Sequence, residues 1–119
     1  MKTILIVDDE PDVPVLFEQY YEDEIAAHKV KFEYAADAKS ALEMLKQLDY
    51  VLILTDINMP IMSGIELLRV IKTTMPEKKV VMVTAYGDEK NRKKCQEYGA
   101  DCLITKPINF DSLRQFILE

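Results

Sequence analysis

The feature that most constrains the fold of this chain is a regular alternation of short apolar runs with longer amphipathic stretches. Residues 4–7 and 80–83 are short runs of Val, Ile, Leu and Met, which are typical of strands buried on both faces of a sheet. The stretches between such runs repeat their apolar residues at helical spacing. Strands that alternate with helices pair in parallel through right-handed crossovers. The alternation therefore predicts an α/β domain with a doubly wound five-stranded parallel sheet in a three-layer α/β/α sandwich.

The predicted elements follow one another without a linker or a repeat. Strands are expected at residues 4–7, 30–34, 51–54, 80–83 and 101–105, and helices at 13–27, 38–48, 67–75, 88–98 and 110–117. Pro60 and Gly64 are expected in a loop after the third strand. The fourth predicted helix is very polar and offers only Cys95 and Tyr98 for apolar contact. We therefore expect this helix to be held loosely.

Composition and charge narrow the classes of function. The length of 119 residues suits a single domain, residues 1–119. The net charge of -6 argues against direct nucleic-acid binding, since a phosphate backbone attracts clustered Lys and Arg. No apolar run has the length of a signal peptide or a membrane span, and Cys95 and Cys102 lack the spacing of a zinc site or a disulfide framework. We therefore expect a cytoplasmic domain with reduced thiols and no membrane partner.

Polar side chains directly follow four of the predicted strands. They are Asp8 and Asp9 after the first strand, Asp56 after the third, Thr84 (followed by Ala85) after the fourth, and Lys106 (followed by Pro107) after the fifth. Doubly wound sheets bind ligands at the carboxyl ends of their strands, where the strand order reverses. Neighbouring carboxylates repel one another unless a cation lies among them, and oxygen ligands without His or Cys favour Mg²⁺. The sequence therefore predicts a magnesium site at this edge of the sheet.

The other side chains at this edge indicate what the metal would do. Mg²⁺ held by few protein ligands commonly neutralises a phosphate oxygen, and Lys106 can pair with the same phosphate. A carboxylate can be the nucleophile that forms an aspartyl phosphate, and Asp56 is the candidate because it stands alone on the central strand. Thr84 offers a hydroxyl that can donate to the new phosphoryl oxygens. Each residue alone has an ordinary explanation, such as a helix-terminal acid or a solvated lysine, and only the combination predicts a site.

Four motifs resemble those of the receiver domain of two-component response regulators, and the resemblance extends from Lys2 to Leu118. The motifs are Ile4-Leu5-Ile6-Val7-Asp8-Asp9-Glu10-Pro11, Asp56-Ile57-Asn58-Met59-Pro60 with Gly64, Val83-Thr84-Ala85, and Thr105-Lys106-Pro107. The resemblance implies a flavodoxin-like fold of the receiver type. It also implies a signalling phosphoacceptor rather than an enzyme, because such a domain catalyses only its own phosphorylation and dephosphorylation.

The resemblance further implies roles for single residues. Asp56 would be the phosphoacceptor, with Lys106, Thr84 and Ala85 binding the phosphoryl group and switching with it. The metal ligands would be Asp8 (mainly through water), Asp9, Asp56 and the backbone carbonyl of Asn58. The metal would be Mg²⁺, with Mn²⁺ as a substitute. The Lys106-Pro107 peptide bond would be cis, a form that is uncommon even before proline.

Partners are implied for both the input and the output of the signal. The phosphoryl donor would be a phosphohistidine on a sensor histidine kinase or a phosphotransfer protein, with small acyl phosphates as substitutes. The fourth predicted helix, fifth strand and fifth helix would contact a downstream effector or a second protomer. The basic run Lys90, Arg92, Lys93 and Lys94 is expected as a solvated face of that fourth helix and a docking patch.

One position departs from the family pattern, and it concerns the switch. Leu103 stands where the fifth strand of the family usually carries Tyr or Phe. Either Leu103 makes a weaker version of the same inward packing, or Thr84 acts on the output face through the loop at 85–87. The sequence leaves both interpretations open.

Other classes of protein remain as alternatives to this hypothesis. A haloacid-dehalogenase-like phosphatase also uses a strand-end aspartate with Mg²⁺, but it needs a second acid two residues on, where this chain has Asn58, and a cap domain. A flavodoxin-like cofactor binder needs a phosphate loop rich in glycine and hydroxyl groups after the first strand, where the acids of this chain would repel phosphate. A pseudo-receiver that only docks partners has no need for the full set of acids, Thr84 and Lys106.

Overall fold

The computed structural model describes residues 1–59 and 61–118, so Pro60 and Glu119 lie outside the described part of the predicted domain. Five strands are described: β1 (Lys2–Val7), β2 (Val30–Ala35), β3 (Leu52–Asp56), β4 (Val80–Thr84) and β5 (Cys102–Thr105). The helices described are α1 (Asp12–Tyr20), α2 (Glu22–Ala26), α3 (Ala38–Gln47), α4 (Gly64–Thr74), α5 (Glu89–Glu97) and α6 (Phe110–Leu118). Gly64, predicted in a loop, is the first residue of α4. None of the described helices is long and apolar enough to cross a membrane.

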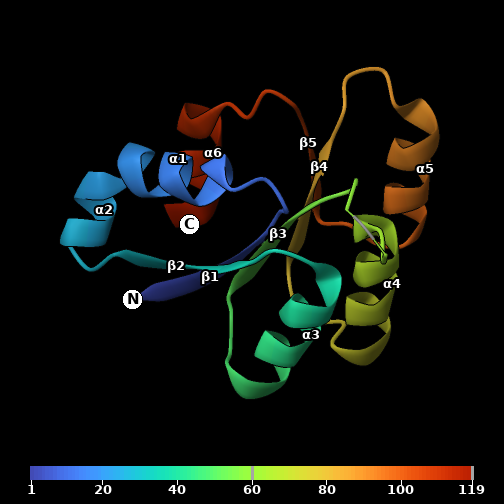
Figure 1. The fold of residues 1–119 in the computed structure, drawn as a ribbon, viewed down its shortest axis with the longest axis horizontal. Helices are drawn as coiled ribbons and strands as arrows, with labels where there is room; N and C mark the ends of the chain where they lie inside the picture. Colours follow the sequence, from blue (N-terminus) through green and yellow to red (C-terminus); the bar gives the residue numbers. More distant parts are fainter. Residues whose placement is uncertain (60, 119) are drawn as a thin grey trace.

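The strands form one parallel sheet in the order β2-β1-β3-β4-β5. The order reverses between β1 and β3, which is the doubly wound topology predicted from the alternation. Every residue of β3 is buried, as expected for the central strand. Figure 1 shows the sheet between α1, α2 and α6 on one face and α3, α4 and α5 on the other. The three-layer sandwich is therefore confirmed.

The two faces of the sheet carry separate hydrophobic cores. Ile4 and Ile6 of β1 point into the core with α1 and α6, whereas Leu5 and Val7 point into the core with α3, α4 and α5. This alternation follows from the two-residue period of a strand. Residues of both cores are almost fully buried, which explains why the strand sequences are continuously apolar.

The first predicted helix, residues 13–27, was wrong as a single element. The chain forms α1 and α2 there, which meet at Tyr21, where φ is -103° and ψ is 26°. The Tyr21 ring is 1% exposed and lies against Phe17 and Phe32, and its hydroxyl donates to the backbone carbonyl of Phe110 at 2.8 Å. The chain leaves the helical path at this residue because the tyrosine is anchored between β2 and α6.

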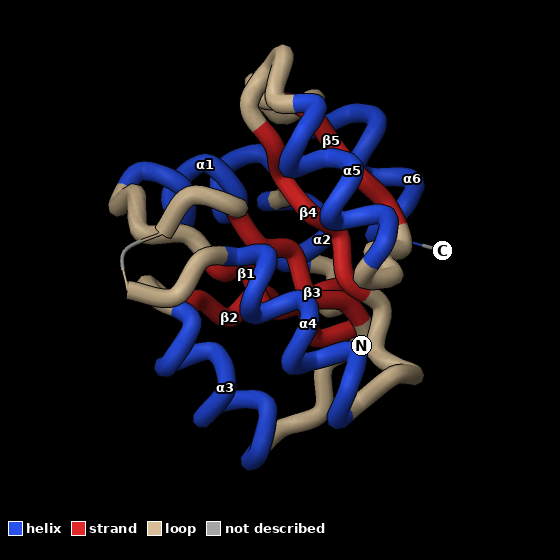
Figure 2. Tube along the Cα trace, turned by 90° about the vertical axis from the view of Figure 1, so that its right-hand side faces the viewer, coloured by secondary structure: helices blue, strands red, loops and turns tan. Residues whose placement is uncertain are grey.

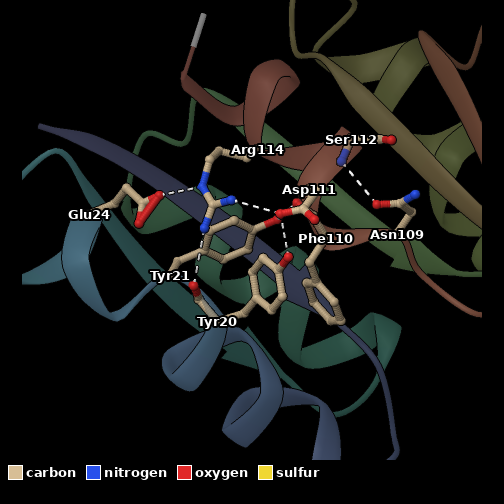
Figure 3. A network of polar contacts seen from close by, with 8 residues as sticks. All are labelled: Tyr20, Tyr21, Glu24, Asn109, Phe110, Asp111, Ser112 and Arg114. Carbon is tan, nitrogen blue, oxygen red and sulfur yellow. Dashed lines mark hydrogen bonds and ion pairs between the residues drawn. The ribbon is translucent and has the colours of Figure 1, made fainter.

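A polar network fixes α6 against the junction of α1 and α2 (Figure 3). Arg114 Nε donates to Glu24 Oε2 at 2.7 Å, and Arg114 Nη1 donates to Asp111 Oδ1 at 3.0 Å. The guanidinium carbon lies 5.1 Å from the ring centre of Tyr20 and 5.4 Å from that of Tyr21. Asp111 also accepts a hydrogen bond from the Tyr20 hydroxyl. Hydrogen bonds to charged groups and cation–π contacts both favour this arrangement, so α6 is firmly held.

α5 is attached to the sheet by fewer apolar side chains. Figure 2 shows α5 beside α4, in front of the sheet. Cys95 is the one buried side chain of α5, all of whose residues the structure describes. Tyr98, predicted as the second apolar contact of this helix, follows its last turn and is 39% exposed. The Asp88 carboxylate caps the helix by accepting from the backbone N–H of Asn91 at 3.3 Å.

Candidate functional site

The strand register brings the predicted site residues to one edge of the sheet. It pairs Val7 with Thr55, Asp56 with Val83, and Thr84 with Thr105. Asp8 and Lys106 follow the ends of β1 and β5 directly. The edge therefore contains carboxylates, a hydroxyl and an ammonium group beside the point where the strand order reverses, which is the expected place for a ligand site.

Three carboxylates gather at this edge, from Asp8, Asp9 and Asp56. One oxygen of each lies within 4.8 Å of the others. Asp56 is buried, with 4% of its surface exposed, whereas Asp9 is exposed and Asp8 is half-buried. Such a set of hard oxygen donors without nitrogen or sulfur fits Mg²⁺, which takes oxygen ligands and keeps several of its waters. The donor chemistry of the three residues therefore fits the predicted metal.

The pKa of Asp8 reflects its partial burial and the neighbouring acids. Partial burial raises the pKa of Asp8, and the negative charge of Asp56 adds to this effect. The backbone N–H of Glu10 donates to Asp8 Oδ1 at 2.9 Å and opposes the rise. Proximity of like charges and loss of water both disfavour the ionised carboxylate. A cation among these groups would offset the repulsion and favour the ionised carboxylates.

Lys106 points at the buried aspartate. Its Nζ lies 2.9 Å from Asp56 Oδ2 and 3.6 Å from Glu10 Oε1. Partial burial works against the charged form, but the hydrogen bond to Asp56 and the nearby carboxylates raise the pKa of Lys106 above its usual value. The backbone N–H of Lys106 donates to the Thr84 carbonyl at 2.8 Å, and the Lys106-Pro107 bond is cis. The lysine is therefore a fully charged partner for Asp56 at neutral pH.

Thr84 lies at the end of β4 with no exposed surface. Its hydroxyl is 3.4 Å from the Ile104 carbonyl and 3.2 Å from Arg92 Nη1. These partners belong to β5 and α5, so the hydroxyl is directed toward that side of the site. Ala85 follows immediately and is exposed.

The loop after β3 approaches the aspartate through its backbone. The N–H of Asn58 donates to Asp56 Oδ1 at 3.3 Å. A Cβ atom on Gly64 would lie 2.0 Å from the Asp56 backbone oxygen, so only glycine fits at the start of α4. The sequence identified Gly64 as a loop marker and missed this contact, because a close approach between distant segments leaves no local signal.

The positions of Leu103 and Arg92 bear on two of the predictions, those for the switch and for the basic run. Leu103 is half-buried and packs against the core on the α5 side of the sheet. Arg92 was predicted on a solvated face, but it is half-buried and its Nη1 also lies 2.9 Å from Thr105 Oγ1. That expectation was wrong for Arg92, because β4 and β5 both end in threonines that offer acceptors to a long side chain. The neighbouring Lys93 and Lys94 are exposed, as predicted.

The sheet order and the acidic strand ends place this chain in the class of doubly wound α/β domains with an acidic pocket at the carboxyl edge of the sheet. Within this class, the family model described as the response regulator receiver domain matches residues 4–118. The chain belongs to the response regulator receiver domain family.

Relatives and solved structures agree with this assignment. The chain is 36% identical over 119 residues to the chemotaxis protein CheY of Halobacterium salinarum, a match that covers 98% of this chain and 93% of that protein. It is 34% identical over 113 residues to the response regulator protein PilR of Pseudomonas aeruginosa, which covers 95% of this chain and 24% of PilR. A CheY-like receiver domain from Methanospirillum hungatei is 35% identical with a TM-score of 0.87, covering 98% of this chain and 90% of that one.

The structure of the response regulator TrrA from Thermotoga maritima, in complex with Mg²⁺ and BeF, is also similar, with 30% identity and a TM-score of 0.83 over 98% of this chain and 96% of that one. Receiver domains bind Mg²⁺ at an acidic pocket, receive phosphoryl groups from histidine kinases and regulate effector domains. The family is one of signalling phosphoacceptors, and the assignment does not favour the phosphatase or the pseudo-receiver. The chain spans only 24% of the length of PilR and 29% of the length of a cyclic di-GMP phosphodiesterase of T. maritima.

Proposed function

We propose that this receiver domain accepts a phosphoryl group on Asp56, with Mg²⁺ held beside it. The observation that carries the proposal is the contact of Lys106 Nζ with Asp56 Oδ2 at 2.9 Å, in a cluster whose other carboxylates lie within 4.8 Å. A buried carboxylate between a metal site and a lysine is placed to attack phosphorus and to have the resulting charge neutralised.

In the proposed reaction, a carboxylate oxygen of Asp56 forms the new P–O bond. The P–N bond of a donor phosphohistidine breaks at the same time, and the imidazole leaves with the bonding electron pair. Asp8, Asp9, Asp56 and the Asn58 carbonyl would hold the ion, which supplies positive charge to the phosphoryl oxygens when bound. Lys106, whose Nζ lies 2.9 Å from Asp56 Oδ2, would contribute a second positive charge.

The product would then attract Thr84. A phosphoryl group presents strong acceptor oxygens, and the Thr84 hydroxyl at the end of β4 is the nearby neutral donor. Movement of this hydroxyl away from β5 would change the surface of α5, β5 and α6, which we propose contacts the effector or a second protomer. Ala85 would follow because it is the next residue in the chain, at the start of the loop after β4.

The donor would dock beside the same site. Val13, Leu16, Ile108 and Phe110 line a groove that continues to Asp8 and Lys106. Leu16 is 47% exposed although it is apolar. We propose that a kinase or phosphotransfer domain covers this groove, because a phosphohistidine carried there would face Asp56.

Mn²⁺ as a substitute metal and the cytoplasmic location stay predictions.

Incubation with a small acyl phosphate and Mg²⁺ tests the proposal. We expect intact-mass spectrometry to find one added phosphoryl group in the wild type and none in Asp56→Asn. Asp101→Asn serves as the matched control, because Asp101 directly precedes β5, at the opposite edge of the sheet from the cluster, and pairs with Lys72. Labelling that persists in Asp56→Asn would overturn the assignment. Absence of both labelling and beryllofluoride binding in the wild type would favour the pseudo-receiver.

A further inference from the structure

The hydroxyl of Thr84 is bound by a side chain of α5. Arg92 Nη1 donates to Thr84 Oγ1 at 3.2 Å and to Thr105 Oγ1 at 2.9 Å. Among the ion pairs formed by residues 1–59 and 61–118, none includes Arg92. The observed partners of this half-buried guanidinium are therefore two neutral hydroxyls, one from the end of β4 and one from the end of β5.

The one donor proton of the Thr84 hydroxyl and one of its acceptor sites are both directed toward β5 and α5. A threonine hydroxyl has a single proton to donate, and here the acceptor is the Ile104 carbonyl at 3.4 Å. Its oxygen accepts from Arg92, and the residue has no exposed surface through which water can compete. The hydroxyl can donate to a new acceptor near Asp56 only by giving up the bond to Ile104. That bond is long for an O–H···O contact, so the interaction with the charged guanidinium is the stronger restraint.

We propose that Arg92 is a positioning residue that holds Thr84 in its resting orientation and releases it when Asp56 is phosphorylated. The proposal rests on the phosphoacceptor function proposed above. On moving toward the phosphoryl group, the Thr84 hydroxyl would donate to it instead of to Ile104 and would leave the hydrogen bond that it accepts from Arg92, and Arg92 would keep Thr105. The strength of the resting bond therefore opposes activation, and removing it shifts the equilibrium toward the activated position.

This contact also identifies a route from the site to the outer surface. Leu103 has no polar atom with which to follow a hydroxyl, whereas Arg92 joins Thr84 to α5 directly. Arg92 lines an open pocket with Tyr86 and Lys93, and the Tyr86 side chain is 91% exposed. Release of one of its partners frees a cation at that pocket. α5 thus reports the position of Thr84 through a charged side chain rather than through an inward-packed residue on β5.

Beryllofluoride with Mg²⁺, as a phosphoryl mimic, tests the proposal through binding linkage. We would measure half-saturating beryllofluoride concentrations by amide NMR for the wild type and for Arg92→Met, Arg92→Lys and Lys90→Met. Arg92→Met should bind about fivefold to tenfold more tightly, the factor that corresponds to the net contribution of a typical intramolecular hydrogen bond. Arg92→Lys should restore affinity toward the wild-type value. Lys90→Met is the control, because it removes a charge from α5 without touching Thr84.

A double-mutant comparison shows whether the effect passes through the Thr84 hydroxyl. In a Thr84→Val background, Arg92→Met should change the affinity by less than about twofold, because the coupled hydroxyl is gone. The same tightening in that background would overturn the proposal, and so would weaker or unchanged binding of Arg92→Met alone. If Arg92→Met does not fold, the Arg92→Lys and Arg92→Gln variants are compared, with tighter binding expected for the glutamine. A wild type that binds no beryllofluoride would instead overturn the proposed function itself.

Discussion

The two helices beside the edge strand β5 are each tied to the rest of the molecule by one arginine, and the two arginines are bound very differently. Arg114 of α6 meets the carboxylates of Glu24 and Asp111 and lies over two tyrosine rings (Figure 3). The guanidinium of Arg92 on α5 has hydrogen bonds only to the hydroxyls of Thr84 and Thr105 among the described residues. Bonds to carboxylates are costly to break, whereas bonds to hydroxyls are exchanged more readily. Arg114 is therefore a permanent anchor of α6, whereas the bonds of Arg92 can be released.

The packing of the two helices follows the same division. α6 buries Leu113 and Ile117, and its half-buried Phe110 stacks on Tyr20. α5 buries Cys95 alone, in a helix that the structure describes completely. Apolar burial is the larger part of helix attachment, so α6 has much more to lose by moving. Of the three elements in the proposed output surface, α5 is therefore the one expected to move.

The largest expected effect comes from the anchor. Arg114→Leu leaves the Glu24 carboxylate, which is 12% exposed, without its partner and removes the contacts with both tyrosine rings. We expect this to lower the free energy of unfolding by about 2 kcal/mol in urea denaturation. Arg69→Leu, an exposed arginine on α4, is the matched control and should stay within about 0.5 kcal/mol of the wild type. Equal losses in the two variants would remove the basis for calling Arg114 an anchor.

The attachment of α5 can be tested at its N-cap. Asp88→Ala removes the N-cap of this helix and should cost about 1 kcal/mol. Because unfolding of α5 uncovers only Cys95, the loss should appear as local opening, with the α5 amides exchanging about fivefold faster in native-state hydrogen exchange. Asp37→Ala is the control, since Asp37 caps α3, which buries Ala38, Ala41 and Leu45. We expect α3 amides to open together with those of β3. α5 amides as protected as those of β3 would contradict a loosely held helix.

The sequence supports the fold prediction well because the fold depends on period and burial. Both are local properties of the chain, and the continuous apolar strands correctly indicated a sheet covered on two faces. The break at Tyr21 was missed because it depends on where that side chain finds a hydrogen-bond acceptor, and the acceptor is the Phe110 carbonyl, far along the chain. The period of 13–27 remains helical across the break, so pattern alone cannot place it.

In the candidate site, too, some features could be predicted from the sequence and others could not. Asp8, Asp56, Thr84 and Lys106 could be predicted because topology carries strand ends to one edge. The contacts of Arg92 with Thr84 and Thr105 could not be predicted, because a basic run on a polar helix is typical of a solvated face. Its inward direction depends on the β4-β5 register, which sets Thr84 beside Thr105 and provides two acceptors at one point. The sequence gives no direct measure of that register.

A smaller effect concerns the pH dependence of the anchor. The hydrogen bond from Arg114 lowers the pKa of Glu24 below its usual value. A carboxyl group with a lowered pKa in the folded state contributes stability above its unfolded pKa of about 4.3, and this contribution is lost as pH falls through the folded pKa. We expect the difference in melting temperature between the wild type and Glu24→Gln to be largest near neutral pH, to correspond to less than about 1 kcal/mol, and to shrink below about pH 4. A difference that is constant with pH would show that Glu24 acts through packing.

Of these substitutions, we expect the one at Arg92 to change stability least, in contrast to the one at Arg114. Arg92→Met removes two hydrogen bonds, but it also removes the cost of keeping a charge half-buried. Methionine can cover the same surface with its unbranched chain. We expect the free energy of unfolding without phosphoryl mimic to stay within about 0.5 kcal/mol of the wild type, as measured in urea. A loss as large as that of Arg114→Leu would make Arg92 a second permanent anchor. A small loss, beside a tighter beryllofluoride affinity, means that Arg92 distinguishes between two states of the domain while adding little net stability to the resting one.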